Sequence, residues 1–289
     1  MGLFVLGFAL RQRGYLQARH AGMLFAVVVN VGLPALMLGT LSREPLQAEF
    51  ALLPLFAAAM VVGGLLVSWT AGRMLRLPRA SHGAFTACAA SLNIGFEYPF
   101  VLAGWGSAAF AQLAIFDVGN AVMHMTVLYM AAAAMGGHRT NLQAALRRTA
   151  QFPPLWGLTA ALIINLMRIP VPGLLLDGLL RTGQVLMLAV VFALGILLEP
   201  RHLLGRAVLA LVGLRFTMGI VGGLIAVTLL DVYGLQRHIM LVGAAAPVAF
   251  STVAIAQREH LDVELATAAA SLSALLGVVL LPIALLALR

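Results

Sequence analysis

Long runs of apolar residues, separated by short polar connections, occupy almost the whole chain. About 20 apolar residues form a helix long enough to cross the hydrocarbon core of a bilayer. Because the runs approach this length, they predict an all-α membrane protein of about ten transmembrane helices. The candidate spans are Met1–Leu10, Ala21–Leu41, Glu49–Gly72, His82–Ala103, Ala108–Met135, Pro153–Met167, Pro172–Leu198, Ala207–Leu230, His238–Gln257 and Val263–Leu288. The first span is short, and we expect the natural helix to extend upstream of Met1.

Composition supports a membrane protein and excludes several other classes. Of the 289 residues, 62% are hydrophobic and only 10% charged, whereas soluble proteins carry roughly 25% charged residues. The single cysteine, Cys88, excludes an intramolecular disulfide framework. The sequence contains no P-loop, no HExxH and no nucleophile elbow. We therefore expect no cofactor, no bound metal and no enzymatic activity.

The arginines predict how the helices are oriented. All basic residues are arginine, and they lie mainly in short loops, which indicates topology and not nucleic-acid binding. Twelve lie on one side and four on the other, so we predict a multi-pass protein of the cytoplasmic (inner) membrane with both termini outside and the central loop in the cytoplasm. The twelve are Arg11, Arg13, Arg19, Arg73, Arg76, Arg79, Arg139, Arg147, Arg148, Arg201, Arg206 and Arg258; the four are Arg43, Arg168, Arg237 and Arg289.

The two halves of the chain show an internal similarity. Val61–Val67 reads VVGGLLV and Ile220–Ala226 reads IVGGLIA, an offset of 159 residues. Each half has five predicted spans, so the second half enters the membrane with opposite polarity, as in the inverted repeats of many secondary transporters. We predict a first repeat over residues 1–135, a cytoplasmic loop with a short amphipathic helix over 136–152, and a second repeat over 153–289.

Spans four and nine contain the most informative polar residues. Pro99 and Pro247 are expected to break or kink their helices. Paired broken helices in an inverted repeat are a pointer to a substrate site, because their N-termini carry partial positive charge. The alternative is a simple proline kink with packing side chains. The candidate substrate-binding residues are Asn93, Gly95, Glu97, Pro99, Arg215, Pro247, Ser251 and Thr252.

Glu97 and Arg215 are charged residues that lie in the middle parts of predicted spans four and eight. A charge at the centre of a bilayer is costly, so Glu97 is interpreted either as a proton-coupling or ligand-gating carboxylate or as the structural partner of a buried arginine. Arg215 could hold a substrate carboxylate with its planar donor fork, or neutralise Glu97 or Asp117. Both alternatives stay open for each residue.

Span five carries a polar stripe. Asp117, Asn120 and His124 are spaced three and four apart, which places them on one helix face. We interpret the stripe either as an interhelical contact or as part of the transport pathway, with Asp117 and Asn120 as pathway or coupling candidates. In span seven, Asp177 and Arg181 are spaced as an i,i+4 salt bridge.

Several stretches resemble the auxin efflux carrier family of transporters. LGFALRQRGYL resembles the family's opening span, NIGFEYP its Asn-x-Gly…Pro segment, FDVGN a stretch of span five and AAAPVAFSTVAIA the proline-broken span nine. The resemblance implies two inverted five-helix repeats whose spans four and nine cross near a central substrate site. It implies a scaffold of spans one, two, six and seven, which forms the dimer contact in plant members, and an elevator-type movement of the other spans.

The resemblance carries over to the two breaks residue by residue. Asn93 and Pro99 match the first break, and Pro247, Ser251 and Thr252 match the second. Two departures affect the substrate. The family usually has a glycine between its aromatic residue and the proline, and here Glu97 occupies that neighbourhood with slightly shorter spacing; Ser251 or Thr252 stands where span nine usually has asparagine.

We therefore predict a secondary transporter, and specifically an efflux carrier, of a small organic anion, with proton or sodium coupling and a homodimer left open. The main alternative is a sodium-coupled symporter of the bile-acid-transporter type. An intramembrane enzyme with Glu97, Asp117 and His124 as acid/base groups is a further alternative, but these residues lack a recognisable catalytic spacing.

Overall fold

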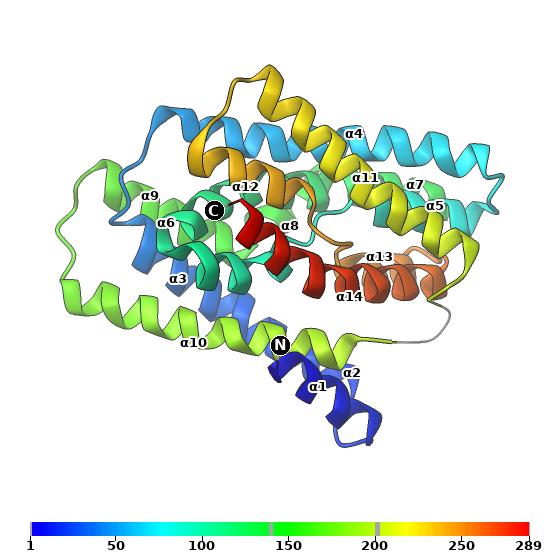
Figure 1. Cartoon of the computed structure of the whole chain (residues 1–289), viewed down its shortest axis with the longest axis horizontal. Coiled ribbons are helices and arrows are strands. Elements are labelled where there is room, and N and C mark those ends of the chain that lie inside the picture. Colours follow the sequence, from blue (N-terminus) through cyan, green and yellow to red (C-terminus); the bar gives the residue numbers. More distant parts are fainter. Residues whose placement is uncertain (1, 139–140, 200–202, 289) are drawn as a thin grey trace. The chain divides into compact units, whose positions relative to one another are not determined.

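The computed structural model describes residues 2–138, 141–199 and 203–288 (Figure 1). All secondary structure in these ranges is helical, which confirms the all-α prediction. Arg139, Arg201 and Arg289, which entered the count of loop arginines, lie outside the described residues. The predicted amphipathic helix of the central loop is present as α8, Leu142–Ala150.

Six helical segments in the described ranges are long and apolar enough to cross a membrane. They are Ala18–Leu41, Ala48–Met74, Arg79–Gly136, Gly173–Leu197, Arg206–Leu229 and Val263–Ala287. Two shorter apolar helices, Gly2–Gln12 and Pro153–Leu166, coincide with predicted spans one and six. Predicted spans four and five both fall within Arg79–Gly136, and predicted span nine is divided between two short helices. These helices indicate a multi-pass membrane protein, while the number of ten crossings stays a prediction.

The chain divides into two compact units, each built from stretches that are distant in sequence. Unit 1 comprises Met1–Phe50, Gly95–Ile115 and Gln151–Leu198, and unit 2 comprises Ala51–Ile94, Phe116–Ala150 and Glu199–Arg289. The helix α6, Ile94–Met123, contributes to both units and has a kink at Gly106, whose φ of 82° favours glycine.

Unit 1 is organised around its longest helix, α10. This helix packs against α1, α2 and α3, and α3 also packs against α9. At Gly39 the backbones approach so closely that a Cβ atom would lie 2.7 Å from the backbone nitrogen of Leu180. The helices of unit 1 besides its part of α6 are α1 (Gly2–Gln12), α2 (Ala18–Val27), the π-helical turn η1 (Val28–Gly32), α3 (Leu33–Leu41), α9 (Pro153–Leu166) and α10 (Gly173–Leu197). The short 3₁₀ helix η2 (Ala48–Ala51) lies where the chain leaves unit 1.

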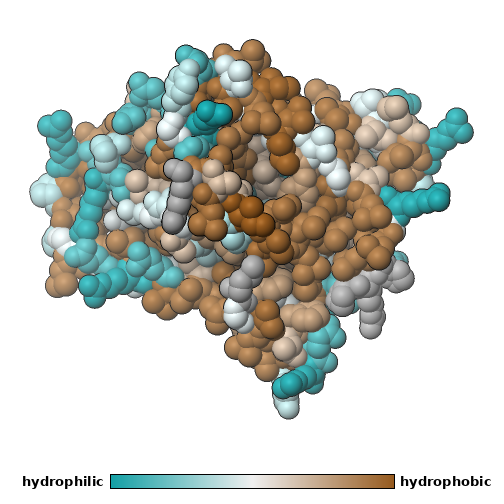
Figure 2. All heavy atoms as spheres, viewed as in Figure 1, coloured by the Kyte–Doolittle hydropathy of each residue, from teal (hydrophilic) through white to brown (hydrophobic). Residues whose placement is uncertain are grey.

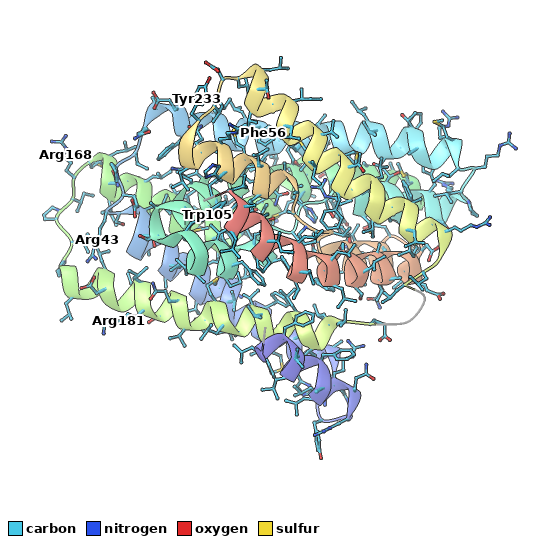
Figure 3. All side chains as sticks on the ribbon, viewed as in Figure 1. Arg43, Phe56, Trp105, Arg168, Arg181 and Tyr233 are labelled. Carbon is cyan, nitrogen blue, oxygen red and sulfur yellow. The ribbon has the colours of Figure 1, made fainter. Side chains whose placement is uncertain are left out.

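The expected salt bridge between Asp177 and Arg181 is wrong. Arg43 lies in the loop after α3 (labelled in Figure 3). Its guanidinium donates to Asp177 Oδ1 at 2.6 Å and to the carbonyl of Gly173 at 2.8 Å. Arg43 therefore binds both the Asp177 side chain and a backbone carbonyl in the first turn of α10. Arg181, which lies on α10 itself, cannot reach that carbonyl.

Unit 2 contains the remaining helices. They are α4 (Leu52–Met74), α5 (Arg79–Ala90), the end of α6, the π-helical turn η3 (His124–Leu128), α7 (Tyr129–Gly136), α8, α11 (Arg206–Leu229), α12 (Gly234–Ala244), α13 (Ser251–Arg258) and α14 (Val263–Ala287). Exposed apolar residues such as Ile220 and Leu224 on α11 and Val279 and Ile283 on α14 give these helices a hydrophobic outer surface (Figure 2). Such a surface suits contact with lipid.

The Gly-Gly pairs that suggested a repeat occupy similar environments within unit 2. A Cβ atom on Gly64 of α4 would lie 3.1 Å from the Cα of Ala90, the last residue of α5. A Cβ atom on Gly223 of α11 would lie 3.3 Å from the Cβ of Ala244, the last residue of α12. The second glycine of each pair thus packs against the residue at which the neighbouring helix ends. The inverted repeat itself stays a prediction.

Candidate functional site

The first helix break lies between α5 and α6. The helix α5 ends at Ala90, and Ser91 is extended, with φ −77° and ψ 149°. Helix α6 begins at Ile94 and continues through Pro99. Span four is therefore broken, but at residues 91–93, so the prediction that Pro99 is the point of the break is wrong. Pro99 lies in the second turn of α6, where it costs one backbone hydrogen bond without ending the helix.

The second break lies between α12 and α13 and contains Pro247. Helix α12 ends at Ala244 and α13 begins at Ser251, so the residues between them have no regular helical structure. The prediction that Pro247 interrupts span nine is confirmed. Thr252, in the first turn of α13, donates its hydroxyl to the carbonyl of Ala249 at 2.7 Å.

The two breaks hydrogen-bond directly to each other. The backbone N–H of Asn93 donates to the carbonyl of Pro247 at 3.0 Å, and its side-chain amide donates to the carbonyl of Val248 at 3.3 Å. In the opposite direction, the backbone N–H of Ala249 donates to Ser91 Oγ at 3.0 Å. Residues more than 150 positions apart are thus brought together at one crossover within unit 2.

Neighbouring helices bind further backbone groups of the crossover. Ser273 Oγ on α14 accepts from the N–H of Val248 at 3.0 Å. Asn120 on α6 donates its side-chain amide to the carbonyl of Leu92 at 3.3 Å. Non-helical backbone at membrane depth is tolerated only when protein or a water-filled cavity satisfies it. The packing of unit 2 therefore allows both helices to be broken.

Arg215 is completely buried and lies beside the second break. Its Nε donates to the carbonyl of Ala246 at 3.0 Å, and its Nη2 donates to the carbonyl of Ala244. A cation at the C-terminal end of a helix also interacts favourably with the helix dipole. The guanidinium therefore holds the end of α12, which favours a structural contribution of Arg215.

Asp117 and Asn120 are neighbours, as their spacing predicted. The side-chain amide of Asn120 donates to Asp117 Oδ1 at 2.7 Å as well as to Leu92. The polar stripe of span five thus reaches the first break. Gly95, Glu97 and Pro99 belong to the part of the chain assigned to unit 1, where the Glu97 side chain is 1% exposed. The coupling or gating contribution of Glu97 stays a prediction.

His124 and Ser251 connect the polar stripe to α13. Ser251 Oγ and His124 Nε2 lie 3.0 Å apart, and His124 begins the π-helical turn η3. Isolated π-helical turns are frequent at functional sites. These two residues also line a cavity of about 310 Å³ within unit 2. Its lining is His124, Met125, Tyr129, Ser251, Ala254, Ile255 and Arg258.

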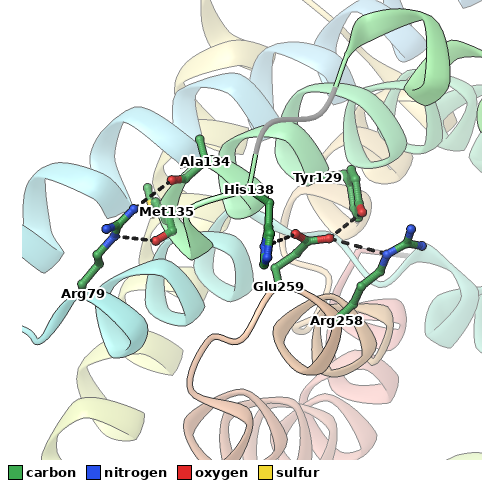
Figure 4. Close-up of polar contacts among 7 residues, drawn as sticks. All are labelled: Arg79, Tyr129, Ala134, Met135, His138, Arg258 and Glu259. Atoms are coloured by element: carbon green, nitrogen blue, oxygen red, sulfur yellow. Dashed lines mark hydrogen bonds and ion pairs between the residues drawn. The ribbon is translucent and has the colours of Figure 1, made fainter.

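A buried carboxylate adjoins this cavity. Glu259 is 3% exposed, and its Oε1 accepts from the hydroxyl of Tyr129 at 2.5 Å (Figure 4). His138 Nδ1 lies 3.1 Å from Glu259 Oε2, and Arg258 Nε lies 3.6 Å from Oε1. Arg79 donates to the carbonyls of Met135 and Ala134 at the end of α7. Tyr129 and His138 thus connect α7 and the residues after it to the end of α13, and Arg79 connects the end of α7 to the start of α5.

Sequence analysis missed Tyr129, Arg258 and Glu259 as site residues. Arg258 was treated only as a topology signal, although Ser251, Ala254, Ile255 and Arg258 have the i, i+3, i+4, i+7 spacing of a single helix face. That spacing could have indicated a shared surface on α13. No local signal indicates that Tyr129 meets Glu259, because these residues are 130 positions apart.

Comparison with known proteins decides the family. The family model described as membrane transport protein matches residues 2–285. The chain belongs to this family. The match confirms the resemblance to auxin efflux carriers that the sequence motifs indicated. Membrane transport proteins move solutes and are not enzymes, in agreement with the sequence expectation.

Two archaeal relatives of this membrane transport protein align over nearly its whole length. An uncharacterized transporter of Methanothermobacter thermautotrophicus is 27% identical over an alignment 289 residues long. The alignment covers 97% of this chain and 93% of the relative. An uncharacterized transporter of Methanocaldococcus jannaschii is 24% identical over 277 residues, covering 91% of this chain and 88% of the relative.

Proposed function

We propose that this membrane transport protein is a secondary transporter, and specifically an efflux carrier, of a small organic anion across the inner membrane. The observation that carries the proposal is the crossover of the two breaks, at which the N–H of Asn93 donates to the carbonyl of Pro247. Two interrupted helices that meet inside one compact unit match the substrate sites of inverted-repeat transporters.

The chemistry of the crossover suits an anion. Helices α6 and α13 both begin there, at Ile94 and Ser251. The N-terminus of a helix offers partial positive charge and backbone N–H donors to a negatively charged group. We propose that Asn93, Ser251 and Thr252 orient the substrate beside these two N-termini, and that Arg215 positions the end of α12 for the same site.

The two compact units support an elevator-type alternation of access. Unit 1 contains α1, α2, α3, α9 and α10, which correspond to the implied scaffold spans one, two, six and seven. Unit 2 contains both breaks and corresponds to the implied moving part. Gly95–Ile115 departs from this scheme, because that stretch of span four and five groups with unit 1. A homodimer formed through the scaffold belongs to the same proposal.

A ligand-stabilisation screen of purified protein tests the anion proposal. We expect small carboxylates to raise the thermal midpoint of unfolding, because a ligand that binds only the folded state stabilises it. The corresponding neutral amides should not do so. Stabilisation by neutral or cationic solutes, with none by any anion, would contradict the proposal.

Sodium-coupled symport is a second candidate that one observation favours. Asn120 Oδ1 is buried and accepts no hydrogen bond from the part of the chain that is described, and the Asn120 side chain also lies beside the carboxylate of Asp117 and the carbonyl of Leu92. Carboxylate, amide and carbonyl oxygens are ligands suited to hard cations. Transport in proteoliposomes that requires a sodium gradient, and that Asp117→Asn abolishes, would favour symport over uncoupled efflux.

A further inference from the structure

The turn between α4 and α5 (Figure 1) carries three arginines within seven residues, Arg73, Arg76 and Arg79. The chain has no aspartate or glutamate from residue 50 to residue 96. Among the described residues, no carboxylate forms an ion pair with any of the three arginines. The carboxylate of Asp262, whose N–H bonds the start of α5, instead caps the start of α14. Because Arg79 donates to carbonyls at the end of α7, Arg73 and Arg76 are left as exposed cations at the turn.

The backbone at Arg76 has a conformation that favours glycine. Helix α4 ends there, with the N–H of Arg76 donating to the carbonyl of Arg73 at 3.0 Å and the N–H of Leu77 donating to the carbonyl of Gly72 at 3.2 Å. In this helix-ending motif the residue with left-handed backbone is usually glycine, as it is at Gly137 after α7. Arg76 has a φ of 53°. The turn thus keeps an arginine where the backbone favours a residue without a side chain, which points to a contribution of that side chain.

His82 and Trp69 hold the two helices of the turn together. A Cβ atom on Gly72 would overlap the ring of His82, so glycine lets this imidazole lie over the end of α4. His82 Nε2 lies 2.9 Å from the carbonyl oxygen of Trp69, and the centres of the two rings lie 6.4 Å apart. The guanidinium carbon of Arg73 lies 4.7 Å from the centre of the Trp69 ring, which is a cation–π distance. The tryptophan and the basic turn therefore form one surface.

An apolar stripe of α4 leads to this surface. Its exposed residues are spaced three, four or seven positions apart, which places them on one helix face with Arg73; they are Leu55, Val62, Leu66 and Trp69. Leu66 and Arg73 are about 10 Å apart along the helix axis. Tryptophan is enriched at the boundary between hydrocarbon and headgroups, and arginine extends its charge from there to the headgroup level. The order of stripe, tryptophan and arginines matches the order of acyl chain, glycerol backbone and phosphate in a phospholipid.

We propose that the α4–α5 turn binds a phospholipid with an anionic headgroup. The phosphate lies between Arg73 and Arg76, and one acyl chain lies along Trp69, Leu66 and Val62. A zwitterionic headgroup carries a cation beside its phosphate, so it gains less from two arginines that no described carboxylate neutralises. The site concerns the lipid around the protein and does not depend on the identity of the transported solute.

Trp69 itself can report the binding of this lipid. In a Trp105→Phe, Trp156→Phe background Trp69 is the only tryptophan, and brominated acyl chains quench tryptophan fluorescence on contact. The full-length protein is reconstituted in phosphatidylcholine vesicles with either brominated phosphatidylglycerol or brominated phosphatidylcholine at equal mole fractions. An arginine near the membrane surface favours anionic lipid by about fivefold, so brominated phosphatidylglycerol should reach half-maximal quenching at a mole fraction about fivefold lower or less. Salt at about 0.5 M should reduce this preference by screening.

Glycine variants separate lipid binding from folding. Arg76→Gly removes the side chain and suits the left-handed backbone, so the thermal midpoint should change little while the preference for phosphatidylglycerol falls severalfold. Arg73→Gln should also lower the preference. Arg168→Gly is the matched control, because Arg168 follows α9 in unit 1 with the same pair of backbone hydrogen bonds and a φ of 52°. It should leave the quenching of Trp69 unchanged.

Three results would overturn the lipid site. One is equal quenching by the two brominated lipids, and another is a folded Arg76→Gly variant that keeps the full preference for phosphatidylglycerol. The third is relief of quenching by an excess of glycerol 3-phosphate, which would assign the arginines to a soluble anion. If the background with two phenylalanines does not fold, native mass spectrometry of the wild-type, Arg76→Gly and Arg168→Gly proteins with both lipids measures the same preference and is judged by the same criteria.

Discussion

At the scale of single residues, Ser91 and Asn93 show how side chains connect two broken helices. Each lies in the first break and binds a backbone group of the second, Ser91 through the N–H of Ala249 and Asn93 through the carbonyl of Val248. Both are short polar residues that can satisfy backbone groups released by a helix break. The crossover therefore depends on particular side chains as well as on the absence of helix.

Replacing Ser91 with alanine should destabilise the protein. The substitution leaves the buried N–H of Ala249 without its acceptor, which costs about 1–3 kcal/mol in the free energy of unfolding. Thermal unfolding in detergent, followed by circular dichroism, measures the effect. Ser107→Ala is the control, because Ser107 is exposed where it bonds Glu44. Equal thermal midpoints for Ser91→Ala and wild type would contradict this account of the crossover.

Arg215 is predicted to act through α12 and not through direct contact with substrate. Arg215→Gln should lower the thermal midpoint strongly, because it removes donors from the buried carbonyls of Ala244 and Ala246. Arg206→Gln is the control: Arg206 is exposed at the start of α11, the helix that carries Arg215, and its substitution should change the thermal midpoint little. A variant at Arg215 with an unchanged midpoint but no ligand-induced stabilisation would instead identify a substrate contact.

The sequence could predict some of these residues but not their partners. Asn93 and Pro247 stood out because polar or helix-breaking residues are unusual in apolar spans. The break was predicted at Pro99 because proline disfavours the helix interior. A helix that has just begun can nevertheless continue through a proline. Glu259 went unnoticed because its partners Tyr129 and His138 lie far away in sequence.

At the scale of helices, the second glycine of each Gly-Gly pair lies against the residue at which a neighbouring helix ends. Gly64 lets α4 approach Ala90, and Gly223 lets α11 approach Ala244. The two helix ends lead directly into the two breaks. The sequence indicated the pairs as a repeat, but their contact with the helix ends required the folded structure.

Leucine at Gly64 or Gly223 should displace the neighbouring helix end. We expect each substitution to destabilise the protein by about 1–3 kcal/mol through overpacking, with similar effects at the two sites if the repeat is genuine. Gly63→Leu is a matched control, because a Cβ atom there meets nothing within 4 Å. Thermal midpoints of the three variants provide the measurement. If Gly64→Leu left the thermal midpoint unchanged while Gly63→Leu lowered it, the proposed contact between Gly64 and the end of α5 would be contradicted.

The π-helical turn η3 illustrates what sequence patterns miss at this scale. A π-helical turn changes the spacing of side chains by one residue relative to an α-helix. The spacing of Asp117, Asn120 and His124 predicted one helix face, but nothing in the sequence indicated that a π-helical turn begins at His124 or that His124 contacts Ser251. The amphipathic helix α8 was predictable, because its short polar and apolar pattern lies in a loop between two long apolar spans.

At the scale of the whole molecule, the apolar spans and loop arginines predict a multi-pass protein. The pattern of residues alone does not predict the two compact units, and only the family resemblance implied that spans one, two, six and seven group together. Each unit combines three separate stretches of sequence. Which helices group together depends on side-chain packing between distant segments, and periodicity within one helix does not report it. The predicted repeats over residues 1–135 and 153–289 describe sequence symmetry, so each repeat contributes to both units.

The orientation predicted from the arginines can be tested by labelling single cysteines. In a Cys88→Ala background, a membrane-impermeant maleimide should label Pro170→Cys in intact cells, because the loop containing Arg168 is predicted to lie outside. Gln143→Cys on α8 should react only after the membrane is opened. Labelling of Gln143→Cys in intact cells, with protection of Pro170→Cys, would show the opposite orientation.

The most direct test of the crossover as a substrate site is counterflow of radiolabelled carboxylates in proteoliposomes. Wild-type protein and the control Ser107→Ala should exchange at least one small carboxylate. Asn93→Ala, reconstituted in equal amounts and verified as folded, should lose most of this exchange because Asn93 is proposed to orient the substrate at the two helix N-termini. Exchange by Asn93→Ala at the wild-type rate, or by wild-type protein of neutral solutes alone, would contradict the account.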